Sequence, residues 1–237
     1  MARDHGSRPG PEERWSIPVP REKMKELGAD RRFQIAVRLA RVVNAFRFCH
    51  SAAVEFGGVP GSPSNDRQRH QSFLFTCGLL YEAFDVVQEV GRELKNLGAY
   101  REEMVPLMRD AAVRRIRKHD LRLLRNKVVF HFDDEVVEMA LPLLEAHEAE
   151  FLDGLGPSRG SIYFPLADLV GIRYILSEQE ARSDDPGTDL SESERLEQLI
   201  RDVTVFQLRF CDAAEVLITE ILQGVGLKGG PKHVPEE

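Results

Sequence analysis

Three long stretches of the chain place apolar residues at every third or fourth position, and this spacing constrains the fold more than any other feature. The first stretch repeats through Ile35, Leu39, Val42, Phe46, Cys49, Ala53 and Phe56. Comparable stripes run from Phe73 to Leu97 and from Leu196 to Ile221. Because an α-helix turns once in about 3.6 residues, each stripe lies on one helix face. The pattern predicts three long amphipathic helices.

Turn-forming and capping residues predict where these helices begin and end. Two glycines at 57–58 follow the first stripe, Asp66 is a suitable cap for the second helix, and Gly98 is expected to end it. The loop between these two helices is short, which predicts that they lie antiparallel. Residues 191–194 form a capping-box pattern that opens the last long helix, and the glycines within 224–226 are expected to end it.

The chain between the long stripes predicts shorter helices, interrupted by prolines, glycines and acidic caps. It shows no internal repeat and no sustained β alternation, so the predicted fold class is all-α, an antiparallel helical bundle with a C-terminal helical extension. The predicted segments are helices over 100–118, 120–132, 133–155 (kinked or divided at Pro142) and 166–177, an extended stretch over 161–165 and a polar linker over 178–189.

Composition limits the kind of protein. A chain of 237 residues with 42% hydrophobic and 30% charged residues is typical of a folded globular protein. Its apolar runs are too short to cross a membrane, and residues 1–10 lack the apolar core of a secretory signal. Cys49, Cys77 and Cys211 lie in apolar helical patterns, which predicts buried reduced thiols rather than disulfides or zinc ligands. We therefore expect a cytoplasmic protein without membrane contact.

One segment departs from the acidic character of the chain. The net charge of -7 argues against general affinity for nucleic acid. Residues 109–127, however, contain eight basic and two acidic residues, which gives this segment a net charge of +6. Such a concentration attracts phosphate groups. The alternative is a solvated face that is neutralised by acids such as Glu102 and Glu103.

The basic segment ends in an arginine, an amide and a histidine beside apolar residues. Arg125 is followed by Asn126, and four residues separate Asn126 from His131. This motif resembles the signature of the HEPN superfamily, in which a polar residue usually follows the arginine and a histidine comes a few positions later. The resemblance covers about residues 30–155 and implies an all-α domain with two long antiparallel helices.

The resemblance also implies a function. HEPN nucleases are metal-independent endoribonucleases with a composite site at a dimer interface, so we expect RNA and a second copy as partners and no metal or cofactor. Arg125 would be the phosphate clamp, Asn126 an orienting residue and His131 the acid or base. Members of the superfamily often act as toxins or in antiviral defence, sometimes silenced by a nucleotidyltransferase-type antitoxin. The residues expected to guide RNA are Arg115, Lys118, Arg122 and Lys127.

The residue chemistry suits cleavage by the 2′-hydroxyl. A histidine titrates near neutral pH and can accept that proton, and an arginine offers two parallel donors to phosphate oxygens. On a regular helix Arg125 and His131 would lie about 120° apart. A bend at the motif, or two protomers facing each other, would bring such groups together.

A non-catalytic role is the main alternative. Arg125 can instead pair with Asp133 or Asp134, while His131 caps or packs. The chain would then be a HEPN-type helical module that binds a nucleotide or a protein partner. An open, positively charged cleft at the motif favours the nuclease, and buried or paired motif residues favour the module.

Two metal-dependent alternatives are weaker. His119 and Asp120 form the doublet found in HD phosphohydrolases, which are also all-α and require further ligands. The candidates for those ligands are His50, His70 and Asp168 or Asp184. A cation held by His131, Asp133 and Asp134 is the other alternative, although helix capping explains the two acids more simply.

The sequence divides into four predicted parts. Residues 1–28 form an irregular arm rich in proline, 29–155 the HEPN-like helical domain, 156–227 a helical extension and 228–237 a flexible tail. The extension lies outside the resemblance. We expect it to pack on the domain or to contribute to the dimer interface.

Overall fold

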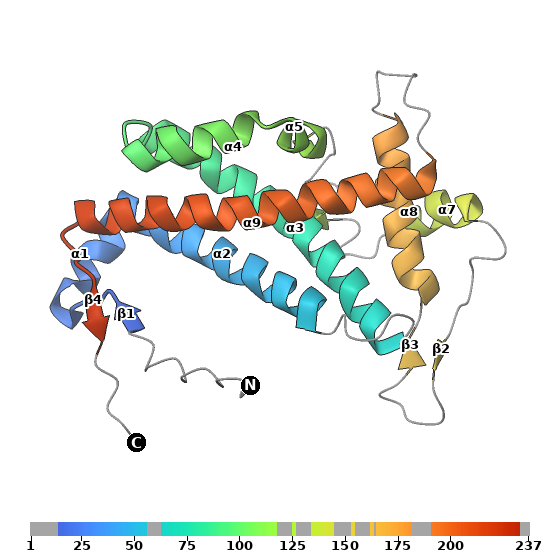
Figure 1. Cartoon of the computed structure of the whole chain (residues 1–237), viewed down its shortest axis with the longest axis horizontal. Helices are drawn as coiled ribbons and strands as arrows, with labels where there is room; N and C mark the ends of the chain where they lie inside the picture. Colours follow the sequence, from blue (N-terminus) through green and yellow to red (C-terminus); the bar gives the residue numbers. More distant parts are fainter. Residues whose placement is uncertain are drawn as a thin grey trace, which may run out of the picture.

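Long helices form the frame of the computed structural model, and the predicted all-α fold class is confirmed (Figure 1). The structure describes residues 14–55, 63–117, 125–126, 134–144, 153–154, 162–163, 165–181 and 191–232. Its α-helices are α1 (Met24–Ala29), α2 (Arg31–Glu55), α3 (Pro63–Glu93), α4 (Val105–Arg109), α5 (Ala111–Arg117), α7 (Asp134–Ala140), α8 (Pro165–Ala181) and α9 (Glu192–Gly224). The shorter turns are η1 (Arg21–Lys23), the π-helix η2 (Tyr100–Met104) and η4 (Leu141–Leu143). None of the described helices is both long and apolar enough to cross a bilayer.

The three predicted long helices are α2, α3 and α9, and they share one hydrophobic core. In Figure 1, α9 runs along the length of the molecule and lies against both α2 and α3. Phe206 of α9 stacks on Phe84 of α3 with ring centroids 5.0 Å apart, and Phe210 meets Phe46 of α2 edge to face at 5.5 Å. α9, which belongs to the segment predicted as a helical extension, therefore supplies part of the centre of this core.

Two predicted ends of the second helix are wrong. The helix begins at Pro63, three residues before Asp66, since the fixed φ of proline suits the first helical turn. It ends at Glu93 instead of continuing to Gly98. The backbone N–H groups of Gly98 and Ala99 donate to the carboxylate of Glu220 at 3.0 and 2.7 Å. Glu220 thus caps the start of the next helical segment from the neighbouring α9, so Gly98 opens a helix instead of ending one.

Local capping signals predict the last helix correctly. Ser191 is the N-cap of α9, and Glu194 completes the capping box with it. The helix ends at Gly224, and Gly226 follows with a φ of 78°, a conformation that glycine adopts without steric cost. The predicted stripe is buried from Val203 onwards, but Ile200 is 41% exposed.

The helix predicted over 100–118 is divided by Asp110. This residue has a ψ of 146°, so the chain leaves the helical conformation between α4 and α5. Its carboxylate accepts hydrogen bonds from the Ala112 N–H at 2.8 Å and from Arg209 of α9 at 2.6 Å. Further on, Pro142 lies in η4 directly after α7, as the predicted break requires. Of the helix predicted over 120–132, the structure describes 125–126 alone.

Two short strand pairs complete the described chain. β1 (Arg14–Ser16) pairs antiparallel with β4 (Gly230–Lys232), so parts of the predicted arm and the predicted tail meet. The sequence did not predict this pairing. β2 (Asp153–Gly154) pairs antiparallel with β3 (Ile162–Tyr163), and β3 lies within the stretch predicted to be extended.

Candidate functional site

Arg125, the first residue of the motif, is held against α3. Its Nη2 atom lies 3.1 Å from Oε1 of Glu82, and its guanidinium carbon lies 5.5 Å from the centre of the Tyr81 ring. The side chain is 37% exposed, so it is anchored but still reaches solvent. Asn126 is half-buried beside it. His131 and Lys127 lie outside the described residues, so the structure does not test how the motif assembles.

Arg125 also lines an open hollow of about 320 Å³ between α2 and α3. We call this hollow the arginine groove, and its lining residues are Arg38, Arg41, Val42, Ala45, Leu79, Glu82, Val86 and Arg125. Three arginines and one glutamate from three separate segments therefore share one surface. Sequence reasoning missed Arg38 and Arg41, although their spacing with Ala45 marks one helix face.

Acids of α3 balance much of the charge beside the groove. Arg38 pairs with Asp85 at 2.8 Å and with Glu89, which also pairs with Arg31. The Glu89 side chain is only 5% exposed, so this carboxylate depends on its two arginine partners. Arg41 is exposed and has no ion pair within the described residues.

Part of the basic segment, residues 109–127, has a structural role. Arg115 of α5, predicted to guide RNA, holds Asp202 of α9 with two hydrogen bonds of 2.6 and 2.8 Å. Asp202 is 7% exposed and also accepts from Gln198 at 2.8 Å. This buried partner occupies the guanidinium fork of Arg115, whose RNA-binding role stays a prediction. Lys118 and Arg122 lie outside the described residues.

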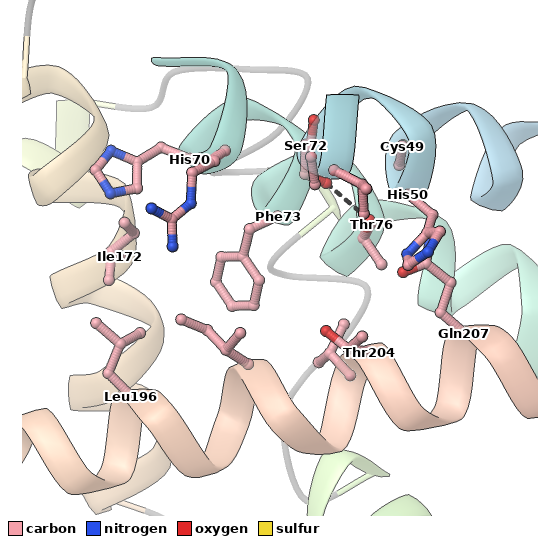
Figure 2. Close-up of a pocket in the computed structure, with 15 residues that line it drawn as sticks. Cys49, His50, His70, Ser72, Phe73, Thr76, Ile172, Leu196, Thr204 and Gln207 are labelled. Carbon is pink, nitrogen blue, oxygen red and sulfur yellow. Dashed lines mark hydrogen bonds between the residues drawn. The ribbon is translucent and has the colours of Figure 1, made fainter. Parts of the chain in front are cut away.

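A second hollow, of about 400 Å³, lies where α2, α3, α8 and α9 meet (Figure 2). We call it the histidine cavity because His50 of α2 and His70 of α3 both line it. Figure 2 shows the two imidazoles at opposite ends of the cavity, with Phe73 between them. Ile172 of α8 forms part of one wall. The sequence analysis considered these histidines only as metal ligands together with His119 and Asp120. It did not predict that they line one cavity, because that depends on how the helices pack.

Several polar groups around the histidine cavity are satisfied internally. Thr76 donates its hydroxyl to the Ser72 carbonyl at 2.7 Å, and the Gln207 amide donates to the Phe46 carbonyl. Burial raises the pKa of the Cys49 thiol, an effect that a hydrogen bond with Thr76 partly offsets. Within the described part of the chain, no group of three or more His, Cys, Asp or Glu side chains is placed to hold a metal ion.

Comparison with known proteins does not indicate a function, so the function has to be argued from the residues of the site. No protein-family model, curated protein or solved structure matches the chain. The resemblance to the HEPN superfamily therefore stays a prediction that depends on Arg125, Asn126 and His131.

Proposed function

We propose that the chain is a HEPN-like, metal-independent endoribonuclease that binds RNA phosphate groups at the arginine groove. One observation carries this proposal: Arg125 of the motif shares an open groove with Arg38 and Arg41 in a chain of net charge -7. Guanidinium groups bind phosphate oxygens through paired hydrogen bonds. A groove lined by arginines from distant segments is therefore a suitable place for the sugar–phosphate backbone.

Exchange of partners at Arg125 is the central step of binding. Glu82 is 38% exposed, and an ion pair between such accessible groups contributes only about 0–1 kcal/mol. A phosphate group can therefore replace Glu82 as one partner of Arg125, while the Tyr81 ring keeps the guanidinium in position. His131 would then accept the 2′-hydroxyl proton or protonate the leaving oxygen, and Asn126 would orient the substrate. A second copy of the chain would supply the other half of the site.

A non-catalytic binding module is the second candidate. The observation that favours it is the anchoring of Arg125 by Glu82 and Tyr81, which gives this arginine a structural role without any substrate. Under this alternative the groove binds a nucleotide or a protein partner and no bond is cleaved.

An RNA cleavage assay in EDTA tests the proposal. The variants are His131→Ala, Arg125→Ala and Arg41→Ala, and the matched control is Arg101→Ala, an exposed arginine that does not line the groove. Wild type and the control should release products that end in 2′,3′-cyclic phosphate. His131→Ala should bind RNA without cleaving it, Arg125→Ala should lose cleavage, and Arg41→Ala should bind more weakly.

Other outcomes would contradict the nuclease proposal. Equal cleavage by all folded variants would exclude the motif as the active site. Groove-dependent RNA binding without cleavage by wild type, in preparations shown to be dimeric by sedimentation, would favour the module. A toxin role predicts slowed growth on expression, relieved by His131→Ala and by a co-expressed nucleotidyltransferase-type antitoxin.

A further inference from the structure

The histidine cavity combines basic and apolar lining residues, and we propose that it binds a small organic anion with an apolar body. This inference stands apart from the proposed nuclease activity. Among the described lining residues are Arg69, His50 and His70, and none is an aspartate or glutamate. The chain contains 39 acidic residues, so a cavity whose described lining lacks them is distinctive. Its electrostatic character favours a negatively charged ligand.

The walls of the cavity supply the apolar contacts. Phe73 of α3 and Ile172 of α8 face it, and α9 contributes Leu196, Ile200 and Val203. Ile200 belongs to the predicted core stripe of α9 but is 41% exposed, because it lines this cavity instead of packing in the core. A ligand with an aliphatic or aromatic body would cover these side chains and gain the free energy of their burial.

The arrangement of the lining residues orients the ligand. Arg69 and His70 are neighbours near the start of α3, and Arg69 carries a permanent charge with no ion pair within the described residues. The anionic group therefore binds at the Arg69 and His70 end. His50 and Thr204 offer hydrogen bonds towards the other end, with Phe73 beside the ligand body (Figure 2). A volume of about 400 Å³ lies in the range of small-molecule sites.

Displacement of a fluorescent probe tests this inference. The probe is 1-anilinonaphthalene-8-sulfonate, an aromatic sulfonate, titrated into the full chain. The competitors are octanoate, octyl phosphate and octanol, which share an apolar body and differ in charge. We expect one probe per chain, and displacement by octanoate or octyl phosphate about tenfold better than by octanol. The better of the two anions identifies the head group as carboxylate or phosphate.

Variants connect binding to the cavity. Arg69→Gln should weaken anion binding about tenfold and leave octanol unaffected, while Arg101→Gln, the matched surface control, should bind as wild type. Thr204→Trp should fill the cavity and abolish binding, and Arg69→Gln provides the test if that variant does not fold. Equal displacement by octanol and the anions, or unchanged anion binding by a folded Arg69→Gln variant, would overturn the inference.

Discussion

The arginine groove and the histidine cavity are both lined by basic residues, but their surroundings differ. Beside the groove, α3 supplies the carboxylates of Glu82, Asp85 and Glu89, which pair with the arginines. The histidine cavity has a permanent cation, Arg69, and no carboxylate among its described lining residues. The two sites therefore differ in the acids that the described residues place beside their arginines.

This difference shows that a count of basic residues does not identify an anion site. In the groove, a phosphate must compete with carboxylates that hold the arginines in place, so affinity reflects an exchange of partners. In the histidine cavity, no described lining residue is a carboxylate that could compete for Arg69, and apolar burial would add to the affinity of an anion. We therefore propose a polyanion with many phosphates for the groove and a single small anion for the cavity.

The largest expected effect concerns cysteine reactivity, which tests access to the histidine cavity. Cys77 lies in the core, where burial raises its pKa to about 12 from 9.0. Its thiolate fraction at pH 8 should therefore be about a thousandfold below that of an exposed thiol. Cys49 lines the cavity, so iodoacetamide should label it faster than Cys77. Mass spectrometry of labelled peptides gives both rates.

The same labelling experiment contains its own control. The fluorescent sulfonate should slow the labelling of Cys49 and leave Cys77 unchanged, since Cys77 does not line the cavity. If Cys49 proves as inert as Cys77 and insensitive to the probe, the cavity does not give small molecules access to the Cys49 thiol.

Next in size is the contribution of the buried acid beside the groove. Glu89→Ala leaves Arg31 and Arg38 without their shared carboxylate, and both arginines can turn to solvent. We expect a loss of about 2 kcal/mol in the free energy of unfolding, measured by urea denaturation. The control is Glu93→Ala, an exposed acid of the same helix, with an expected loss of less than about 0.5 kcal/mol. Equal losses would show that the pairs at Glu89 do not support the fold.

A smaller effect concerns competition between Glu82 and RNA. Glu82→Gln removes the carboxylate that pairs with Arg125, so RNA should bind about two- to fivefold more tightly. Arg41→Ala should lower the slope of affinity against salt concentration by about 1. Fluorescence anisotropy with labelled RNA measures both, in a His131→Ala background that prevents cleavage. Weaker binding by Glu82→Gln would mean that Glu82 positions Arg125 for RNA instead of competing with it.

Sequence periodicity and local caps predicted the frame of the fold because they depend on neighbouring residues. The stripes gave α2, α3 and α9, and the box from Ser191 to Glu194 gave the start of α9. The role of Gly98 was predicted wrongly because Glu220, which caps the next helical segment at Gly98, lies on another helix.

The candidate sites show the same limit. Arg125 stood out in a motif, but Arg38 and Arg41 became relevant only through the packing of α2 against α3. His50 and His70 share a cavity because the last turns of α2 lie beside the first turns of α3. The spacing of residues along the chain does not predict which residues of different helices will line one site. Basic residues that share one helix face, such as Arg38 and Arg41, do indicate part of such a site.

The smallest expected effect concerns Asp110. Its exposed ion pair with Arg209 lies outside both sites and shows how much such a pair contributes to the free energy of unfolding. The hydrogen bond from Arg209 lowers the pKa of Asp110 below its ordinary value of 3.8. The ionised carboxylate thus stabilises the folded state above the unfolded pKa, and this stabilisation disappears as the pH falls through the folded pKa. Asp110→Asn keeps a side-chain cap for α5 but loses the charge. Urea denaturation should show wild type about 0.5 kcal/mol more stable at pH 7, a difference that shrinks below about pH 4. A difference that stays constant between pH 7 and pH 3 would assign the effect to capping and not to the ion pair.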